Sequence, residues 1–181
     1  MAGALGYGLM NLLMTATPLA MSFCSHPYSA AAMVIEWHVV GMYLPGFFTG
    51  SLIRRFGTLK MIVAGVALIG GSIAIALNGV TVMHFLLGLA LLGVGWNFMY
   101  VGGTTLLTEA YNPSEKAKTQ GANDFIVFAV MGISSFSSGA LVSAAGWETM
   151  NAGALPVLVL VAMAVAWLGW TRARPLVPTA T

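Results

Sequence analysis

Ionisable side chains that could do chemistry are few in this 181-residue chain, and two of them stand close together in a long apolar run. Glu36 and His38 are two positions apart, and each can bind and release a proton. On a helix, residues two apart point to different faces, so this pair cannot line one cavity wall. Because such groups are costly in oil, they are candidates for proton coupling, or else for hydrogen bonding near the outer end of the run.

Uncharged polar groups near the middle of other apolar runs can form hydrogen bonds to a polar solute. Asn11 and Asn97 are the main candidates, with Trp96 or Tyr100 as an apolar wall. The same amides could instead bond to neighbouring helices, which contributes about 0.6 kcal/mol per bond on average in membranes. The candidate cavity residues are Asn11, Thr15, Trp96, Asn97, Tyr100, Ser134 and Ser135.

No residue pattern indicates an enzyme. The sequence contains no G-x-S-x-G, H-E-x-x-H or paired C-x-x-C motif. The spacing of the three histidines matches no metal-ligand pattern, so neither a metal nor a cofactor is expected. The net charge of +2 is spread over short segments rather than gathered on a basic and aromatic face, which excludes nucleic acid as a partner.

The elements that must position these residues are membrane-spanning helices. Hydrophobic residues make up 59% of the chain and charged residues 7%, and no soluble domain of this size could bury so much apolar surface. Unbroken apolar runs of this length favour helices over barrel strands. The expected fold is an all-α membrane protein with one six-span domain over 1–171. Its helices are expected at about 3–23, 30–53, 59–77, 81–108, 119–144 and 152–170, with a disordered tail over 172–181.

Basic residues sort the connecting segments into two sets. All seven Lys and Arg residues follow the second, fourth or sixth apolar run, and none follows the first, third or fifth. Positively charged loops stay on the cytoplasmic side during insertion, so both termini are expected in the cytoplasm. The first run begins almost at Met1 and is longer than the apolar part of a signal peptide, which favours a retained span.

The runs also show an internal repeat. Gly6-x-Gly8 precedes Asn11 in the first run, and Gly93-x-Gly95 precedes Asn97 in the fourth. These two runs begin on opposite sides of the membrane, as expected for two inverted three-helix units. Small residues allow helices to approach closely in lipid. The glycines expected at such packing seams are Gly46, Gly50, Gly88, Gly93, Gly95, Gly102 and Gly103.

The connection after the second run resembles the signature G-x-L-x-D-R-x-G of the major facilitator superfamily. Gly50, Leu52, Arg55 and Gly57 fit this pattern, whereas Arg54 stands where the family has its acidic residue. The stretches NLLMTATPLAM, WHVVGMYLPGFFTGSLIRRFG, GVGWNFMYVGGTTLLTEAYNPSEKAKTQGANDF and SSFSSGAL are similar to helices seven to eleven of a bacterial subgroup. The resemblance therefore covers nearly the whole chain.

The resemblance implies one six-helix half of a twelve-helix secondary transporter in a bacterial inner membrane, which moves a small solute by alternating access. The chain would then be a fragment, a truncated product, or a half that pairs with a second copy or with another half. The implied partners are the lipid bilayer, the solute, a second six-helix half and, if Glu36 or His38 titrates, protons. The alternative is a non-transporting membrane subunit or scaffold that binds partner membrane proteins.

The resemblance also implies a cytoplasmic gate beside the signature loop. Arg54 and Arg55 are expected to pair with Glu109 and Asp124 at the inner ends of the fourth and fifth runs. In the family such a cluster latches the outward-open state, and Arg55 is the residue that carries over by motif. The alternative is a set of solvated ion pairs worth about 0 to 1 kcal/mol each. The gate candidates are Gly50, Arg54, Arg55, Gly57, Glu109 and Asp124.

Overall fold

The computed structural model describes residues 2–173, and these residues are helical almost throughout. The elements in order are α1 (Ala2–Phe23), α2 (Tyr28–Tyr43), α3 (Gly46–Phe56), α4 (Thr58–Leu77), α5 (Val82–Thr108), the short 3-10 helix η1 (Pro113–Glu115) and α6 (Lys116–Ala173). No strand occurs among the described residues, which confirms the all-α class. Helix α6 continues through Ala173, and the rest of the expected tail, 174–181, lies outside the described residues.

The second pass of the chain is a bent helix pair. Helices α2 and α3 meet at an angle of 41°, with the break at Leu44 and Pro45. Proline has no N–H to donate to the preceding turn, and its ring clashes with the carbonyl four residues before it. The apolar run over 30–53, expected as one helix, is therefore divided by its own proline.

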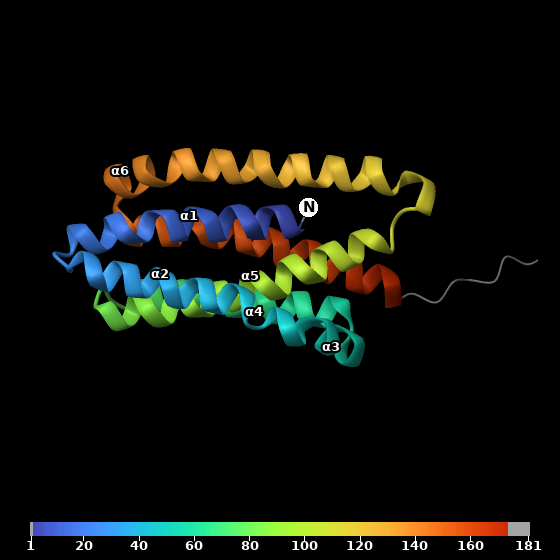
Figure 1. Cartoon of the computed structure of the whole chain (residues 1–181), viewed down its shortest axis with the longest axis horizontal. Helices are drawn as coiled ribbons and strands as arrows, with labels where there is room; N and C mark the ends of the chain where they lie inside the picture. The colour runs from blue at the N-terminus through green and yellow to red at the C-terminus, as the bar shows by residue number, and fades with distance from the viewer. Residues whose placement is uncertain (1, 174–181) are drawn as a thin grey trace, which may run out of the picture.

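Helix α6 consists of two arms that join at Gly146. This glycine has φ 80°, a left-handed backbone conformation that side chains with a Cβ rarely adopt. The chain reverses there, so the arm over 147–173 runs back along the bundle (Figure 1). The helices expected over 119–144 and 152–170 thus meet at a single kink rather than across a loop over 145–151.

Within residues 2–173, three helical segments are long and apolar enough to cross a membrane, namely α4, α5 and the segment that contains η1 and α6. The bent pair α2–α3 makes a fourth if it counts as one span. Helix α1 has a sufficient length of 22 residues, but its glycines, threonines and Asn11 make it less apolar. With α6 divided at Gly146, the described part of the chain passes along the bundle six times.

The first and last described residues lie toward the same end of the bundle. The start of α1, the α3–α4 connection, η1 and the end of α6 all lie toward one end of the bundle (Figure 1). The described Lys and Arg residues belong to these segments: Arg54, Arg55, Lys60, Lys116, Lys118 and Arg172. The basic residues therefore gather at one end, and the compartment that this end faces stays a prediction.

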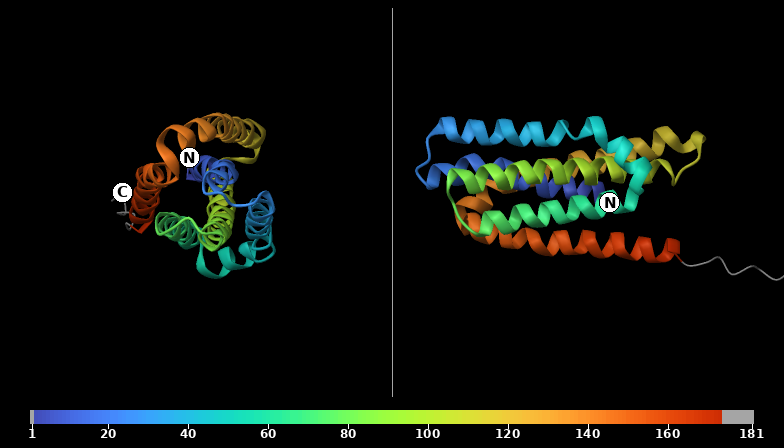
Figure 2. Two further views of the ribbon diagram at one scale, coloured as in Figure 1. Left: turned by 90° about the vertical axis from the view of Figure 1, so that its left-hand side faces the viewer. Right: turned by 90° about the horizontal axis from the view of Figure 1, so that it is seen from below.

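Helices α1 and α5 lie at the centre of the bundle (Figure 2, left). Helix α5 packs against α1, α2 and α4, while α1 packs against α5 and α6. Their fully buried side chains include Met10, Leu13, Leu92 and Met99. The other helices expose large apolar side chains of the kind that contact lipid or a second membrane segment, among them Phe47, Phe48, Phe128, Phe136 and Trp167.

Two glycines of α5 allow direct contact between helix backbones. A Cβ at Gly93 would lie 2.6 Å from the carbonyl oxygen of His38 in α2, and one at Gly95 would lie 2.9 Å from the carbonyl oxygen of Gly65 in α4. The packing role expected for these two residues is therefore confirmed. A Cβ at Gly50 would meet nothing within 4 Å, so the same expectation is wrong for this residue.

Candidate functional site

Four aromatic side chains from three helices meet beside the centre of the bundle. Trp96 and Tyr100, one turn apart on α5, stack with ring centroids 5.1 Å apart and planes 10° apart. Tyr7 of α1 contacts Trp96 and Tyr100 edge-on at 5.2 Å and 5.6 Å, and Tyr43 at the end of α2 lies 6.4 Å from Trp96. We call Tyr7, Tyr43, Trp96 and Tyr100 the aromatic cluster.

Only half of this cluster was expected from the sequence. Trp96 and Tyr100 stood among the candidate cavity residues because they flank Asn97 at mid-depth. Tyr7 and Tyr43 were missed. Tyr7 lies near the start of its apolar run, where an aromatic residue is also typical of a membrane interface, and no polar group beside Tyr43 in the sequence indicates its contact with α5. The spacing of residues along α1 or α2 does not indicate which aromatic ring of α5 either tyrosine will contact.

Asn97, a candidate for solute contact, is buried and uses both ends of its amide within the protein. Its Nδ2 donates to the Met42 carbonyl at 2.8 Å, and its Oδ1 accepts from the Thr49 hydroxyl at 2.6 Å. Among the described residues, no backbone N–H crosses the α2–α3 break to reach the Met42 carbonyl. Asn97 thus satisfies a carbonyl at the break, and its geometry favours bonding between helices over direct contact with a solute.

Asn11 brings together three of the candidate cavity residues. Its Nδ2 lies 2.9 Å from Ser134 Oγ and 2.7 Å from Ser135 Oγ, both on the first arm of α6, and 3.2 Å from the Met131 carbonyl. These bonds fix α1 against α6. No described residue donates a hydrogen bond to its Oδ1, so this oxygen can still accept one from a solute.

Thr15 lies one turn beyond Asn11 on α1, on the same face of the helix. It is exposed, and its hydroxyl forms no hydrogen bond with another described residue. Among the candidate cavity residues of α1, Thr15 therefore has the side chain most accessible to a molecule outside this bundle.

Glu36 and His38 lie on different sides of α2. Glu36 is exposed and lines a pocket of about 280 Å³ together with Pro18 and Tyr28. His38 is fully buried against α5, where its Nδ1 lies 2.7 Å from the Leu89 carbonyl, and its Nε2 has no partner among the described residues. Proton coupling through either residue stays a prediction.

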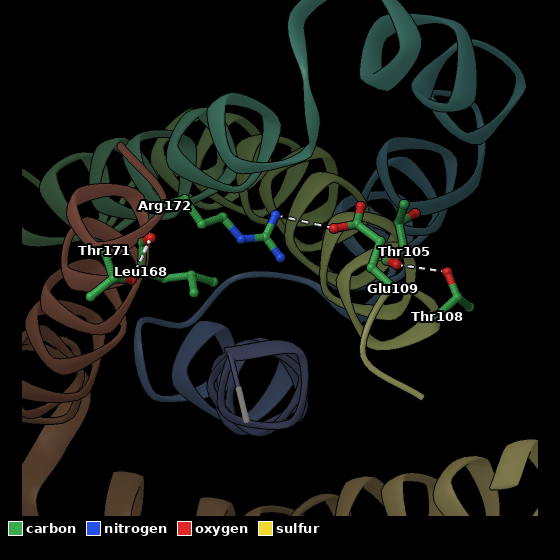
Figure 3. Close-up of polar contacts among 6 residues, drawn as sticks. All are labelled: Thr105, Thr108, Glu109, Leu168, Thr171 and Arg172. Atoms are coloured by element: carbon green, nitrogen blue, oxygen red, sulfur yellow. Dashed lines mark hydrogen bonds and ion pairs between the residues drawn. The ribbon is translucent and has the colours of Figure 1, made fainter. Parts of the chain in front are cut away.

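The basic end of the bundle holds an ion pair different from the one expected. Arg172 Nη1 lies 3.1 Å from Glu109 Oε2, which joins the end of α6 to the end of α5 (Figure 3). Three threonine hydroxyls nearby each donate a hydrogen bond to a backbone carbonyl three or four residues earlier in the same helix. They belong to Thr105, Thr108 and Thr171. This is the only ion pair within residues 2–173.

The arginines of the signature loop contact residues next to them in the chain rather than Glu109 or Asp124. Arg54 donates to Ser51 Oγ at 3.0 Å, and the Arg55 guanidinium lies 5.3 Å from the centroid of the Phe56 ring. Asp124 accepts from Asn123. The structure therefore does not bring Arg54 or Arg55 together with Glu109 or Asp124. Asp124 is distant because α3 and the first arm of α6 lie on opposite sides of the bundle (Figure 2), and Glu109 pairs with Arg172 instead.

The glycine of the signature has a local explanation. Gly57 ends α3 with φ 90°, a conformation that favours glycine, and α4 begins at the next residue. Its position in the signature therefore reflects the tight reversal between two helices.

The Glu109–Arg172 pair is expected to contribute little to stability. Its side chains are 43% and 47% exposed, so their coupling should be about 0.5 kcal/mol. A double-mutant cycle of unfolding free energies with Glu109→Gln and Arg172→Gln measures this coupling. The matched cycle with Glu109→Gln and Arg55→Gln should give about zero, and a larger coupling to Arg55 would contradict the arrangement described.

Comparison with known proteins places these features in a family. The sequence matches the family model of the Major Facilitator Superfamily over residues 1–180. It is 46% identical over 160 residues to a riboflavin transporter, RfnT, of Brucella anthropi, an alignment that covers 88% of this chain and 40% of the relative. No solved structure matches the chain.

Two relatives from Bacillus subtilis carry only family-level names. The uncharacterized MFS-type transporter YdeG is 31% identical over 169 residues, which cover 92% of this chain and 38% of the relative. The uncharacterized MFS-type transporter YddS is 33% identical over 161 residues, which cover 88% of this chain and 37% of the relative. The chain thus spans 37% to 40% of the length of these curated relatives.

Proposed function

Because the chain belongs to the major facilitator superfamily, we propose that it is one six-helix half of a secondary transporter that moves a small solute by alternating access. The observation that carries this proposal is the family match over residues 1–180, which includes every helix of the bundle. The proposed location is the bacterial inner membrane, with the six passes as six spans and the basic end in the cytoplasm. The proposal includes no enzymatic step.

A second six-helix half completes the transporter in this proposal. The chain spans 40% of its riboflavin-transporting relative, so about one half of such a protein is represented. The exposed aromatic side chains of α2, α3 and α6 support a further membrane-embedded partner as well as lipid. The second half is supplied by the same polypeptide, by another one, or by a second copy of this chain.

Riboflavin is the proposed solute. The support is the name of the relative that shares 46% of its residues with this chain over 160 positions. Thr15, the free oxygen of Asn11 and the aromatic cluster are the proposed solute-facing groups. Ser134 and Ser135, which bond to Asn11, would hold that residue in place.

Riboflavin uptake into proteoliposomes tests this proposal. The purified chain alone, as a monomer, is expected to give no uptake above that of empty liposomes. Co-reconstitution with the first six helices of the Brucella relative is expected to give uptake, because the two halves together enclose a cavity. Uptake by the monomer, or none with any second half including a cross-linked copy of the chain, would contradict the proposal.

Thiol labelling separates a transporter from a scaffold. In a Cys24→Ser background, Thr15→Cys should react roughly tenfold faster with a membrane-impermeant thiol reagent than Asn97→Cys, because thiol reactivity follows exposure. Riboflavin should slow the reaction of Thr15→Cys. A scaffold would bury Thr15 against lipid or a partner, so equally slow reaction of both variants would argue against an aqueous cavity.

A further inference from the structure

We infer that the aromatic cluster binds a flat, uncharged aromatic ring system by stacking, and that this ring is the part of the solute the chain recognises. The inference rests on the proposed function, and it assigns both a class of substrate and the residues that select it. Three independent features of the cluster support it: the geometry of its rings, an unpartnered indole N–H, and the absence of charge.

The rings of the cluster already form a stack with edge contacts. Trp96 and Tyr100 are nearly parallel, at 10°, and both come from the same face of α5. Aromatic rings prefer offset parallel or edge-to-face contacts, and Tyr7 already supplies edge contacts to both rings. Tyr43 makes the loosest contact, 6.4 Å from Trp96, and its side chain is 64% exposed. Tyr43 is therefore the ring of the cluster most able to move and to admit a third flat ring beside Trp96.

The indole of Trp96 has a hydrogen-bond donor with no partner. The side chain is only 6% exposed, yet its Nε1 forms no hydrogen bond with any residue that the structure describes. A buried indole N–H usually has an acceptor, because leaving it unpaired is costly. A ring carbonyl or ring nitrogen of a heteroaromatic solute stacked in the cluster would provide that acceptor.

Further polar groups around the rings are also free. The hydroxyls of Tyr7, Tyr43 and Tyr100 form no hydrogen bonds with other residues of the described chain. Asn11, one turn beyond Tyr7 on α1, keeps its Oδ1 available. The site thus offers both donors and acceptors at the edge of an apolar stack, as binding sites for small heterocycles do.

The cluster contains no charged group. Within residues 2–173, the single cation over an aromatic ring is Arg55 over Phe56, at the basic end of the bundle. An anionic solute at membrane depth would need a counter-charge, because an unpaired ion in a low-dielectric site is strongly disfavoured. Aromatic faces attract cations but not anions, so the observed groups argue against an anionic solute and are compatible with the neutral heteroaromatic ring of the proposed solute.

Binding of three probes to the purified full chain in nanodiscs tests the inference. The probes are riboflavin, lumichrome, which is the same tricyclic system in its alloxazine form without the polyol chain, and D-ribitol, which is the polyol without the ring. Riboflavin and lumichrome are expected to bind within tenfold of each other, with quenching of flavin fluorescence on stacking. D-ribitol should neither bind nor compete. Binding of D-ribitol, or no binding of either ring compound, overturns the inference.

Substitutions in the cluster assign the binding to particular rings. Trp96→Leu should weaken riboflavin and lumichrome binding about ten- to hundredfold, the range for loss of one stacking partner. Trp96→Phe should keep most of the affinity, and Trp167→Leu, at an exposed tryptophan of α6, should keep all of it. Unchanged affinity in Trp96→Leu would overturn the inference.

A second variant distinguishes a loss of binding from a loss of folding. Tyr43 is exposed, so Tyr43→Leu should leave the thermal unfolding transition unchanged and weaken ring binding about fivefold. Full affinity in Tyr43→Leu, with a well-folded Trp96→Leu also at full affinity, would place the ring elsewhere. Ring binding without uptake in any assembly would refute only the proposed transport, whereas uptake of riboflavin that is unaffected by these substitutions would refute only the stacking site.

Discussion

Gly93→Ala is expected to lower the free energy of unfolding by about 3 kcal/mol, the upper part of the usual range for overpacking. The added Cβ would lie 2.6 Å from the His38 carbonyl oxygen and 2.9 Å from the Met42 backbone nitrogen. Both atoms belong to the backbone of α2, so no side-chain rotation can relieve the contact. Relief requires α2 to move away from α5, which would also disturb the packing around His38 and Asn97.

The measurement is equilibrium unfolding in mixed micelles followed by circular dichroism. Gly50→Ala is the matched control, because a Cβ at Gly50 would meet nothing within 4 Å and the residue is also helical. In a helix interior, alanine is more favourable than glycine by up to about 1 kcal/mol of helix propensity, so Gly50→Ala should be neutral or slightly stabilising. Equal stability of the two variants would show that α2 and α5 are not in backbone contact.

Asn97→Ala is expected to cost about 2 kcal/mol of stability, because it leaves buried polar groups without partners. The substitution removes the bonds to the Met42 carbonyl and to the Thr49 hydroxyl on either side of the α2–α3 break. Single hydrogen bonds between membrane helices average only about 0.6 kcal/mol. The larger value expected here comes from leaving the Met42 carbonyl unsatisfied beside a proline break.

Asn151→Ala is the control for this second prediction. Asn151 is equally buried, but its Nδ2 bonds only to the Trp147 carbonyl one turn earlier in its own helix. Its loss should cost about 1 kcal/mol, mainly through the small cavity it leaves. The difference between the two variants, measured in the same unfolding assay, isolates the bonds across the break. A cost for Asn97→Ala no greater than that for Asn151→Ala would contradict the role of Asn97 at the break.

The all-helical architecture was predictable because the solvent dictates it. In lipid, an apolar run of about 20 residues can satisfy its backbone only as a helix. Helices α4 (Thr58–Leu77) and α5 (Val82–Thr108) accordingly begin and end close to their apolar runs. The gathering of basic residues at one end follows from the same physics, since cations are excluded from the apolar layer.

Features that depend on neighbours in space were not predictable in this way. Pro45 is visible in the sequence, but whether a proline bends a membrane helix depends on partners such as Asn97, which lies 52 positions later in the chain. Glu109 likewise pairs with Arg172, which lies 63 positions later in the chain, rather than with Arg55 of the signature loop. Candidate residues could be named from polarity and depth, but their contacts come from the packing of helices.

The reversal at Gly146 has a consequence for how the protein can be detected. At the end of the bundle opposite the basic residues, the helices are joined only by short connections over 24–27 and 78–81 and by this one glycine. Insertions and proteolytic cuts are tolerated mainly at exposed loop tips, and these joints are short. An epitope tag inserted at Gly146 would interrupt a continuous helical hairpin, whereas the longer segment over 109–115 at the basic end has exposed residues that can accept one.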